Sequence, residues 1–283
     1  MTSLWKNESG VNEIHGNKST IKLFFMKNSP VLFLFILIAA CSNNENNLNM
    51  IGAYAMTRQV MNDGTKDSLL DRKQLKIYTP EYIMYASPNI NDSLANFGIG
   101  TYKEQDGKII EYINYRASDG DTEDTVTLNI TKTENGYTQV IDRILIEGQY
   151  YKLTEDYDAV GTNVKSPLDG AWKQVKNVYR SSKGDSSVNN NPLEYKIYQS
   201  GYFIWAITIK DSANNASSVF GYGRFEMDGE NKMKETIQNS TFVQGLIGKT
   251  YEVALAFDGK DRYNQTITFA NGDRSTEYYE RYK

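Results

Sequence analysis

The chain has 283 residues, of which 31 are Lys or Arg and 35 are Asp or Glu, giving a formal net charge of −4. This length accommodates two domains of ordinary size. Phosphate backbones need clustered cations, so a chain without a block of Lys or Arg is not expected to bind nucleic acid. Its single His, His15, and single Cys, Cys41, exclude His- and Cys-based catalysis and the usual zinc and haem shells after residue 41.

The only long apolar run spans residues 31–40 and is followed directly by Cys41. It is too short to cross a bilayer, which takes about 20 helical residues, and it is preceded by Met26-Lys27, so it is typical of a secretory signal. We therefore expect a leader over residues 1–40, with Met26 as the true start. The segment Ile38-Ala39-Ala40-Cys41 resembles a bacterial lipobox, which implies cleavage before Cys41 and a lipidated thiol.

The segment 41–50 is rich in Asn and has little to bury, which predicts a flexible tether after the lipidated Cys41. The protein is then expected in the cell envelope, at the outer membrane and held there by its N-terminal lipid, with the leaflet left open. The alternative is a secreted protein whose leader happens to end near a Cys.

From residue 51 onward the sequence occurs twice. Lys76-Ile77-Tyr78 matches Lys196-Ile197-Tyr198 at a shift of 120 (196 − 76). Further matches are Gly52-Ala53-Tyr54 with Gly170-Ala171-Trp172 at 118 (170 − 52), Phe97-Gly98 with Phe220-Gly221 at 123 (220 − 97), and Tyr150-Tyr151 with Tyr278-Tyr279 at 128 (278 − 150). A shift that grows in small steps indicates longer hairpin loops in the second copy. We predict two copies of one domain, 51–160 and 168–283, joined by the linker 161–167.

Each copy contains eight strand-like segments separated by turn signals such as Asp106-Gly107. In the first copy they span 52–61, 74–79, 82–86, 97–104, 108–116, 125–131, 137–146 and 149–155. In the second they span 171–180, 193–199, 202–210, 218–227, 232–237, 250–258, 262–270 and 274–282. The fold class is therefore all-β, with two tandem antiparallel up-and-down eight-stranded barrels, because closure removes exposed sheet edges.

The opening Gly170-Ala171-Trp172 resembles the G-x-W motif of the lipocalin superfamily. That resemblance implies that Arg281 packs across Trp172 at the closed end of the second barrel, as a structural lock. With the lipobox, the K-I-Y segments, the G-x-G strand and the C-terminal Y-Y-E-R, the chain resembles the lipocalin-like domains of Bacteroidetes lipoproteins. In the first copy Tyr54 replaces the Trp and Leu153 stands where we align Arg281, so no lock is expected there.

An aromatic stripe on neighbouring strands supplies the candidate ligand-lining residues. Alternation places Phe203, Trp205 and Ile207 on one face of their strand, so Trp205 lines the lumen if that face points inward. Filling of the barrel by these rings is the alternative. The candidates are Tyr78, Tyr85, Tyr102, Tyr198, Phe203, Trp205 and Phe225.

Two sets of acidic residues are weaker candidates. Glu111 and Glu235 occupy equivalent positions in different barrels, so they cannot form one catalytic pair, and we expect them to be solvated or at a rim. Asp119, Asp121 and Glu123 alternate as the ligands of a hard cation would, but they lack the glycine and distant Glu of an EF-hand loop. We expect a solvated hairpin tip there and no metal.

Eight strands can enclose either a packed interior or one small ligand. The leading hypothesis is a non-catalytic binding protein for a small apolar or amphipathic ligand, with no cofactor. The alternative is a structural or protein-interaction module with filled barrels. An enzyme of the calycin type would rest on fold analogy alone. Ligand identity and protein partners are left open.

Overall fold

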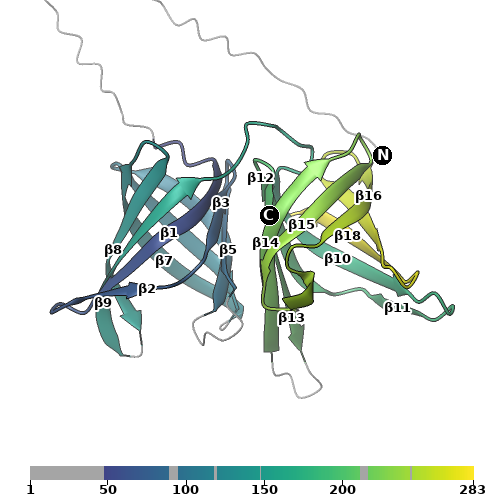
Figure 1. The fold of residues 1–283 in the computed structure, drawn as a ribbon, viewed down its shortest axis with the longest axis horizontal. Helices are drawn as coiled ribbons and strands as arrows, with labels where there is room; N and C mark the ends of the chain where they lie inside the picture. Colours follow the sequence, from purple (N-terminus) through teal and green to yellow (C-terminus); the bar gives the residue numbers. More distant parts are fainter. Residues whose placement is uncertain (1–47, 89–94, 118–119, 147, 211–215, 243) are drawn as a thin grey trace, which may run out of the picture. The chain divides into compact units, whose positions relative to one another are not determined.

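The structure is a computed structural model that describes residues 48–88, 95–117, 120–146, 148–210, 216–242 and 244–283 (Figure 1). All of these residues belong to one compact unit of the chain. The predicted leader and Cys41 lie outside them. Within these ranges no helix has both the length and the apolar character that a membrane span requires.

The first barrel is a single antiparallel sheet of nine strands, eight of which close on themselves. Strand β1 pairs with β3 through its first residues and with β9 along most of its length, which completes the circle. The strands are β1 (Gly52–Asn62), β2 (Asp67–Leu70), β3 (Leu75–Tyr78), β4 (Tyr82–Ser87), β5 (Asn96–Gln105), β6 (Lys108–Arg116), β7 (Gly120–Lys132), β8 (Gly136–Ile146) and β9 (Gln149–Ala159).

The second barrel repeats this topology, with β10 pairing both β12 and β18. Its elements are β10 (Gly170–Arg180), β11 (Ser186–Asn189), β12 (Leu193–Gln199), β13 (Tyr202–Lys210), β14 (Ala216–Met227), β15 (Lys232–Ser240), the 3-10 helix η1 (Gln244–Leu246), β16 (Thr250–Asp258), β17 (Arg262–Thr268) and β18 (Arg274–Arg281). The predicted pair of closed eight-stranded barrels is confirmed.

One short strand in each barrel was not predicted from the sequence. Strand β2 pairs with the end of β1 from Gln59 to Asn62, and β11 pairs with the end of β10 from Asn177 to Arg180. Both strands have only four residues and are largely exposed, so they carry little of the apolar alternation that marks a buried strand. They form because β1 and β10 continue past β3 and β12 and leave free edges.

The alignment of the last strand differs from our prediction. Tyr54 pairs with Ala159 and Trp172 pairs with Arg281, so β9 and β18 correspond at a shift of 122 (281 − 159). The predicted match at 128 is therefore wrong, and Ala159 instead of Leu153 occupies the place of Arg281. The cause is a longer final hairpin in the first copy: β8 and β9 have 11 residues each, whereas β17 and β18 have 7 and 8. Extending both arms of a hairpin changes the numbering without changing the pairing.

The first barrel also begins earlier than predicted. Leu48 and Met50 are buried, at 8% and 2% exposure, in the apolar cluster at one end of that barrel. The backbone N–H of Leu48 donates to both carboxylate oxygens of Glu104, at 3.0 and 2.9 Å. The predicted tether over 41–50 is thus corrected at its last three residues, because two apolar side chains there have a core to enter.

The G-x-G segment of the first copy coincides with a β-bulge. The pairing of β5 with β6 shifts register between Ile99 and Gly100. A Cβ at Gly100 would lie 1.8 Å from the carbonyl oxygen of Tyr112, so only glycine allows the two backbones to approach this closely. Gly223 lies at the matching register shift in the second barrel. The motif is therefore a requirement of barrel curvature.

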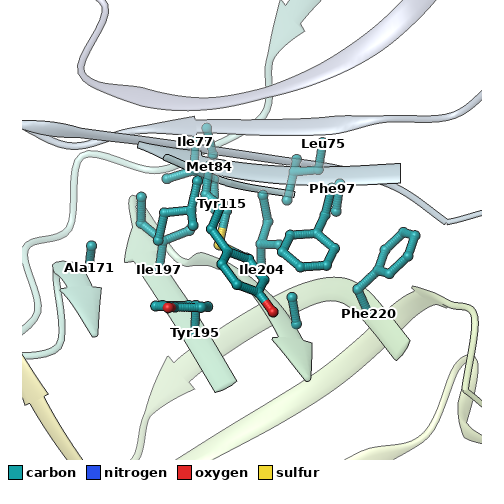
Figure 2. Packing of buried hydrophobic residues seen from close by; sticks show 14 residues of the cluster. Leu75, Ile77, Met84, Phe97, Tyr115, Ala171, Tyr195, Ile197, Ile204 and Phe220 are labelled. Atoms are coloured by element: carbon teal, nitrogen blue, oxygen red, sulfur yellow. The ribbon is translucent and has the colours of Figure 1, made fainter. Parts of the chain in front are cut away.

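Strands β3 and β12 are buried on both faces. Lys76 and Tyr78 face the lumen, whereas Leu75 and Ile77 enter a buried cluster that we call the outer-face cluster. Figure 2 shows this cluster, which collects outward-facing side chains of both barrels. Its ring contacts include Phe97 with Phe220 at 5.3 Å and Tyr115 with Tyr195 at 5.1 Å between centroids. This double burial explains why the K-I-Y segments are the best preserved part of the repeat within the chain.

Candidate functional site

One half of each lumen is filled by rings. In the first barrel Tyr54 meets Tyr137 edge-on at 4.9 Å, and Tyr78 meets Tyr102 edge-on at the same distance. The matching half of the second barrel contains Trp172, Tyr198, Phe203, Phe225, Tyr263 and Tyr279. Five predicted ligand-lining residues therefore lie in the filled halves and take part in packing: Tyr78, Tyr102, Tyr198, Phe203 and Phe225.

The filled half of the second barrel ends at Trp172 and Arg281. The Arg281 guanidinium carbon lies 3.7 Å from the ring centroid of Trp172, within the range of a cation–π contact. Arg281 Nη1 donates to the carbonyl of Asp169 at 2.7 Å, and the Trp172 indole N–H donates to the carbonyl of Leu168 at 2.7 Å. These two side chains thus hold the segment before β10 against the barrel end.

The other half of the first barrel is hollow. It contains a cavity of about 230 Å³, with apolar walls formed by residues such as Ile113, Val126 and Ile141. Tyr85 lines it, and burial raises the pKa of its hydroxyl to about 12, so that group stays neutral. The polar and charged residues of the lining are Gln59, Arg72, Gln74, Lys76, Ser87, Asn96, Glu111, Arg116, Gln139 and Glu155.

A buried polar network lies between this cavity and the rings that fill the other half of the lumen. Lys76 Nζ lies 3.1 Å from Glu111 Oε1 and donates to Gln139 Oε1 at 3.0 Å. Tyr78 donates to the same Glu111 oxygen, and Gln139 donates to Glu155. The pKa of the Tyr78 hydroxyl is raised well above its usual value, by burial first and then by the Glu111 charge. Each buried charge therefore has a fixed partner, as burial in a low dielectric requires.

The second barrel has a cavity of about 190 Å³ in the corresponding place. Its walls are more apolar and include Trp205, Tyr251 and the residues Ile207, Ile237, Phe242, Leu246, Ile267 and Phe269. Phe242 and Phe269 are 56% and 38% exposed, so the cavity reaches the surface between them. Phe203, Trp205 and Ile207 share the inward face of β13. Its polar lining is Glu194, Lys196, Glu235, Gln265 and Glu277.

The network of the second barrel repeats that of the first. Lys196 Nζ lies 3.3 Å from Glu235 Oε1, and Tyr198 donates to that oxygen at 2.8 Å. Gln265 Nε2 donates to Glu277 Oε2 at 2.6 Å. Lys, Tyr, Glu, Gln and a second Glu thus recur at equivalent strand positions in both lumens.

The networks differ at one position that is decisive for charge. In the first barrel Gln74 donates to the Tyr157 hydroxyl, which in turn donates to Glu155 at 2.8 Å. In the second barrel Glu194 stands at the position of Gln74, and the Tyr279 hydroxyl lies 2.7 Å from Glu194 and 2.8 Å from Glu277. A hydroxyl has one proton to donate, so it cannot satisfy two ionised carboxylates.

Burial and this neighbour change the acidity of Glu194. Desolvation raises the pKa of its carboxyl to about 8, with a further increase from the Glu277 charge, against the opposing effect of Lys196. Burial alone would lower the pKa of Lys196, but the charges of Glu235, Glu277 and Glu194 raise it overall. The lysine is therefore a fixed cation, and Glu194 is the carboxyl of this network whose pKa is raised to near neutral pH.

The expectation for Glu111 and Glu235 is wrong. Both are only 4% exposed and lie inside the lumens, where each pairs with a lysine. We had placed them at a solvated rim because a carboxylate on a strand is usually exposed. The missed signal is that Lys76 and Lys196 also recur at matching positions amid apolar residues, so each carboxylate has an opposite charge within reach.

The acidic segment 119–124 falls partly on strand β7. Asp119 lies outside the described residues, whereas Asp121 and Glu123 are exposed on β7 itself instead of at a hairpin tip. Asp124, on the same strand, pairs with Arg116 at 2.7 Å. Across the ranges that the structure describes, no three His, Cys, Asp or Glu side chains come together as a metal site would require.

Comparisons with known proteins do not name an activity for this chain. Residues 167–283 match a family model described as a domain of unknown function, DUF4488. No curated protein matches the chain. Among solved structures, a redesigned β-barrel is 15% identical over 41% of this chain and 93% of its own, with a TM-score of 0.26. A ligand must therefore be argued from the lumens themselves.

Proposed function

We propose that this chain is a non-catalytic binding protein in which each barrel accepts one small amphipathic ligand. The observation that carries this proposal is the division of each lumen into a filled half and a hollow half. Apolar walls with a few convergent polar groups are the usual composition of a ligand site. A packed scaffold would gain stability by filling the hollow half as well, because empty apolar space forfeits dispersion contacts.

The cavity volumes limit the ligand to a small molecule. Volumes of about 190 and 230 Å³ lie below the range of about 300–1,000 Å³ that drug-sized ligands occupy, but above an engineered cavity of about 150 Å³ that binds benzene. The ligand is thus comparable to a short alkyl chain or one substituted ring. Its apolar part lies on the walls, and its polar end meets the lysine–carboxylate network.

The alternative of a filled structural module has less support. It requires a closed lumen and an apolar patch on the outer wall, whereas the apolar outer positions of β3, β4, β12 and β13 are buried in the outer-face cluster. Catalysis is not part of the proposal either. Glu111 and Glu155 are each engaged by Lys, Tyr or Gln partners of their own network, which leaves them as structural charges.

The proposal includes attachment to the cell envelope, at the outer membrane, through lipid on Cys41. Its support is the sequence alone: an apolar run ending in Ile38-Ala39-Ala40-Cys41 before an Asn-rich segment. Metabolic labelling with an alkyne fatty acid is expected to tag the chain, and Cys41→Ser is expected to abolish the label while leaving the barrels folded. Equal labelling of both forms would contradict lipidation at Cys41.

Ligand binding is tested by native mass spectrometry of the full chain purified from cells, compared with variants that fill one cavity. Ile267→Trp and Ile141→Trp place a large ring in the second and first lumen respectively, because both side chains line cavities. Val188→Trp, at a position 53% exposed on β11, is the matched control. We expect a bound small mass that each filling variant reduces and the control retains. A bound mass of equal abundance in all four proteins, or no bound mass in any of them, would refute the proposed function.

A further inference from the structure

We propose that the two cavities prefer ligands of different head-group charge: the second barrel selects an amphiphile with a protonated amine, and the first barrel does not. This inference rests on the proposed function, because it assigns a ligand class to a cavity that the proposed function describes only as amphipathic. It is carried by the charges and hydrogen bonds of the two networks, compared position by position.

The second cavity has an excess of carboxylates. Its lining contains Glu194, Glu235 and Glu277 but only Lys196 as a cation, a formal charge of −2 when all four groups are ionised and −1 while Glu194 holds a proton. Glu194, Lys196 and Glu235 are each no more than 5% exposed. Uncompensated charge at such depth is costly, so a cation entering the cavity is stabilised by a field that the protein already maintains.

The geometry around Tyr279 identifies where the head group would bind. Its single hydroxyl proton lies between Glu194 and Glu277, and Gln265 supplies a further donor to Glu277 Oε2, so two ionised carboxylates share one hydroxyl and one amide, neither of which carries a charge. A primary ammonium supplies three donors in one small group. It can satisfy both carboxylates at once, and the walls formed by Trp205 and Ile237 then accept its alkyl part.

The first cavity lacks this arrangement. Gln74 replaces Glu194, and its amide completes the hydrogen-bond chain through Tyr157 to Glu155 without any ligand. Its lining also contains Arg72 and Arg116, which occupy the positions of Pro192 and Ser240 in the second copy. Arg116 pairs with Asp124 of the first barrel. With Asp124 counted beside Arg116, this cavity has no excess of carboxylates, so it favours a neutral or anionic head group over an amine.

The experiment uses three probes that have the same six-carbon length and differ in head group: hexylamine, hexanol and hexanoate. Binding to the full chain is followed by NMR of isoleucine methyl groups, because Ile113 and Ile141 report on the first cavity, whereas Ile237 and Ile267 report on the second. At pH 7 we expect hexylamine to shift the second set at a concentration at least tenfold lower than the first set. Hexanoate is expected to show the reverse order.

A single matched exchange tests the assigned residue. Glu194→Gln gives the second barrel the amide of the first and is expected to weaken hexylamine binding there at least tenfold while leaving hexanol binding within a factor of about two. Gln74→Glu is expected to strengthen hexylamine binding in the first barrel. Hexanol binding in both cavities with no discrimination between amine and carboxylate would overturn this inference and leave the proposed function standing. No methyl shift with any probe would overturn both.

Discussion

The buried carboxyl pair of the second barrel predicts an unusual pH dependence of stability. Burial raises the pKa of the Glu194 carboxyl in the folded protein to about 8, from its ordinary value of 4.5. An acid whose pKa is raised by folding contributes its full stability below the unfolded value and loses it as the pH rises through the folded value. We therefore expect the free energy of unfolding to fall between about pH 4.5 and pH 8, by about 1.4 kcal/mol per unit and about 5 kcal/mol in total.

The groups that face Glu194 determine the pH range over which it affects the free energy of unfolding. Lys196 lies on the same strand, Glu235 on β15, Gln265 on β17, and Glu277 with Tyr279 on β18. Lys196 opposes the shift and the carboxylates support it. Because desolvation is the larger cause of the shift and the Glu277 charge the second, Glu277→Gln is expected to weaken the dependence, whereas Glu194→Gln removes it.

Urea unfolding from pH 5 to pH 8.5 measures the effect, and the difference between the protein and Glu194→Gln isolates it from every other titrating group. The variant is expected to have similar stability at pH 5 and to be more stable by several kcal/mol at pH 8.5. A total stability of about 5–15 kcal/mol makes a change of this size easy to measure. Parallel curves for the two proteins would show that Glu194 is ionised throughout the range, and the argument would fail.

Three further predictions concern the scaffold. Lys76→Met leaves Glu111 buried without its cation and should lower the free energy of unfolding by about 3–5 kcal/mol, with Lys76→Met/Glu111→Gln recovering part of the loss in a double-mutant cycle. Arg281→Leu removes the ring contact and the bond to the Asp169 carbonyl, so urea unfolding should show a loss of about 1–3 kcal/mol together with a changed Trp172 fluorescence. Gly100→Ala puts a methyl group 1.8 Å from the Tyr112 carbonyl and should lower the melting temperature by several degrees; an unchanged melting curve would contradict the bulge geometry.

The strands and their duplication could be predicted because they depend on local patterns. The K-I-Y segments alternate with period two, and turns such as Asp106-Gly107, with φ of 53° and 69°, require residues that tolerate positive φ. The final hairpin could not be aligned in this way. Its two arms lengthen together, and two pairs of adjacent tyrosines offered a plausible but incorrect match, whereas the pairing of Tyr54 with Ala159 appears only in three dimensions.

The candidate site was predicted less well, for a physical reason. Tyr85 and Trp205 line cavities as the aromatic stripe suggested, but the side chains that set the chemistry of the lumens are Lys76, Lys196 and Glu194. General rules place lysine and glutamate outside. Those rules fail where a closed barrel brings opposite charges from distant strands together, and that coincidence depends on register, which single-strand patterns do not contain.

The comparison between the two lumens also bears on why the chain keeps both copies. A duplicated scaffold whose only task was mechanical would have no reason to preserve a buried ion pair, since apolar residues of similar volume are often at least as stabilising. Both copies nevertheless retain the lysine, the tyrosine and two glutamates at matching positions, while the wall above them changes from Gln74 to Glu194 and from Arg116 to Ser240. A constant polar base under walls of different charge is the arrangement expected of two related sites that accept different molecules, and it makes the exchange of residues 74 and 194 the most informative perturbation of this protein.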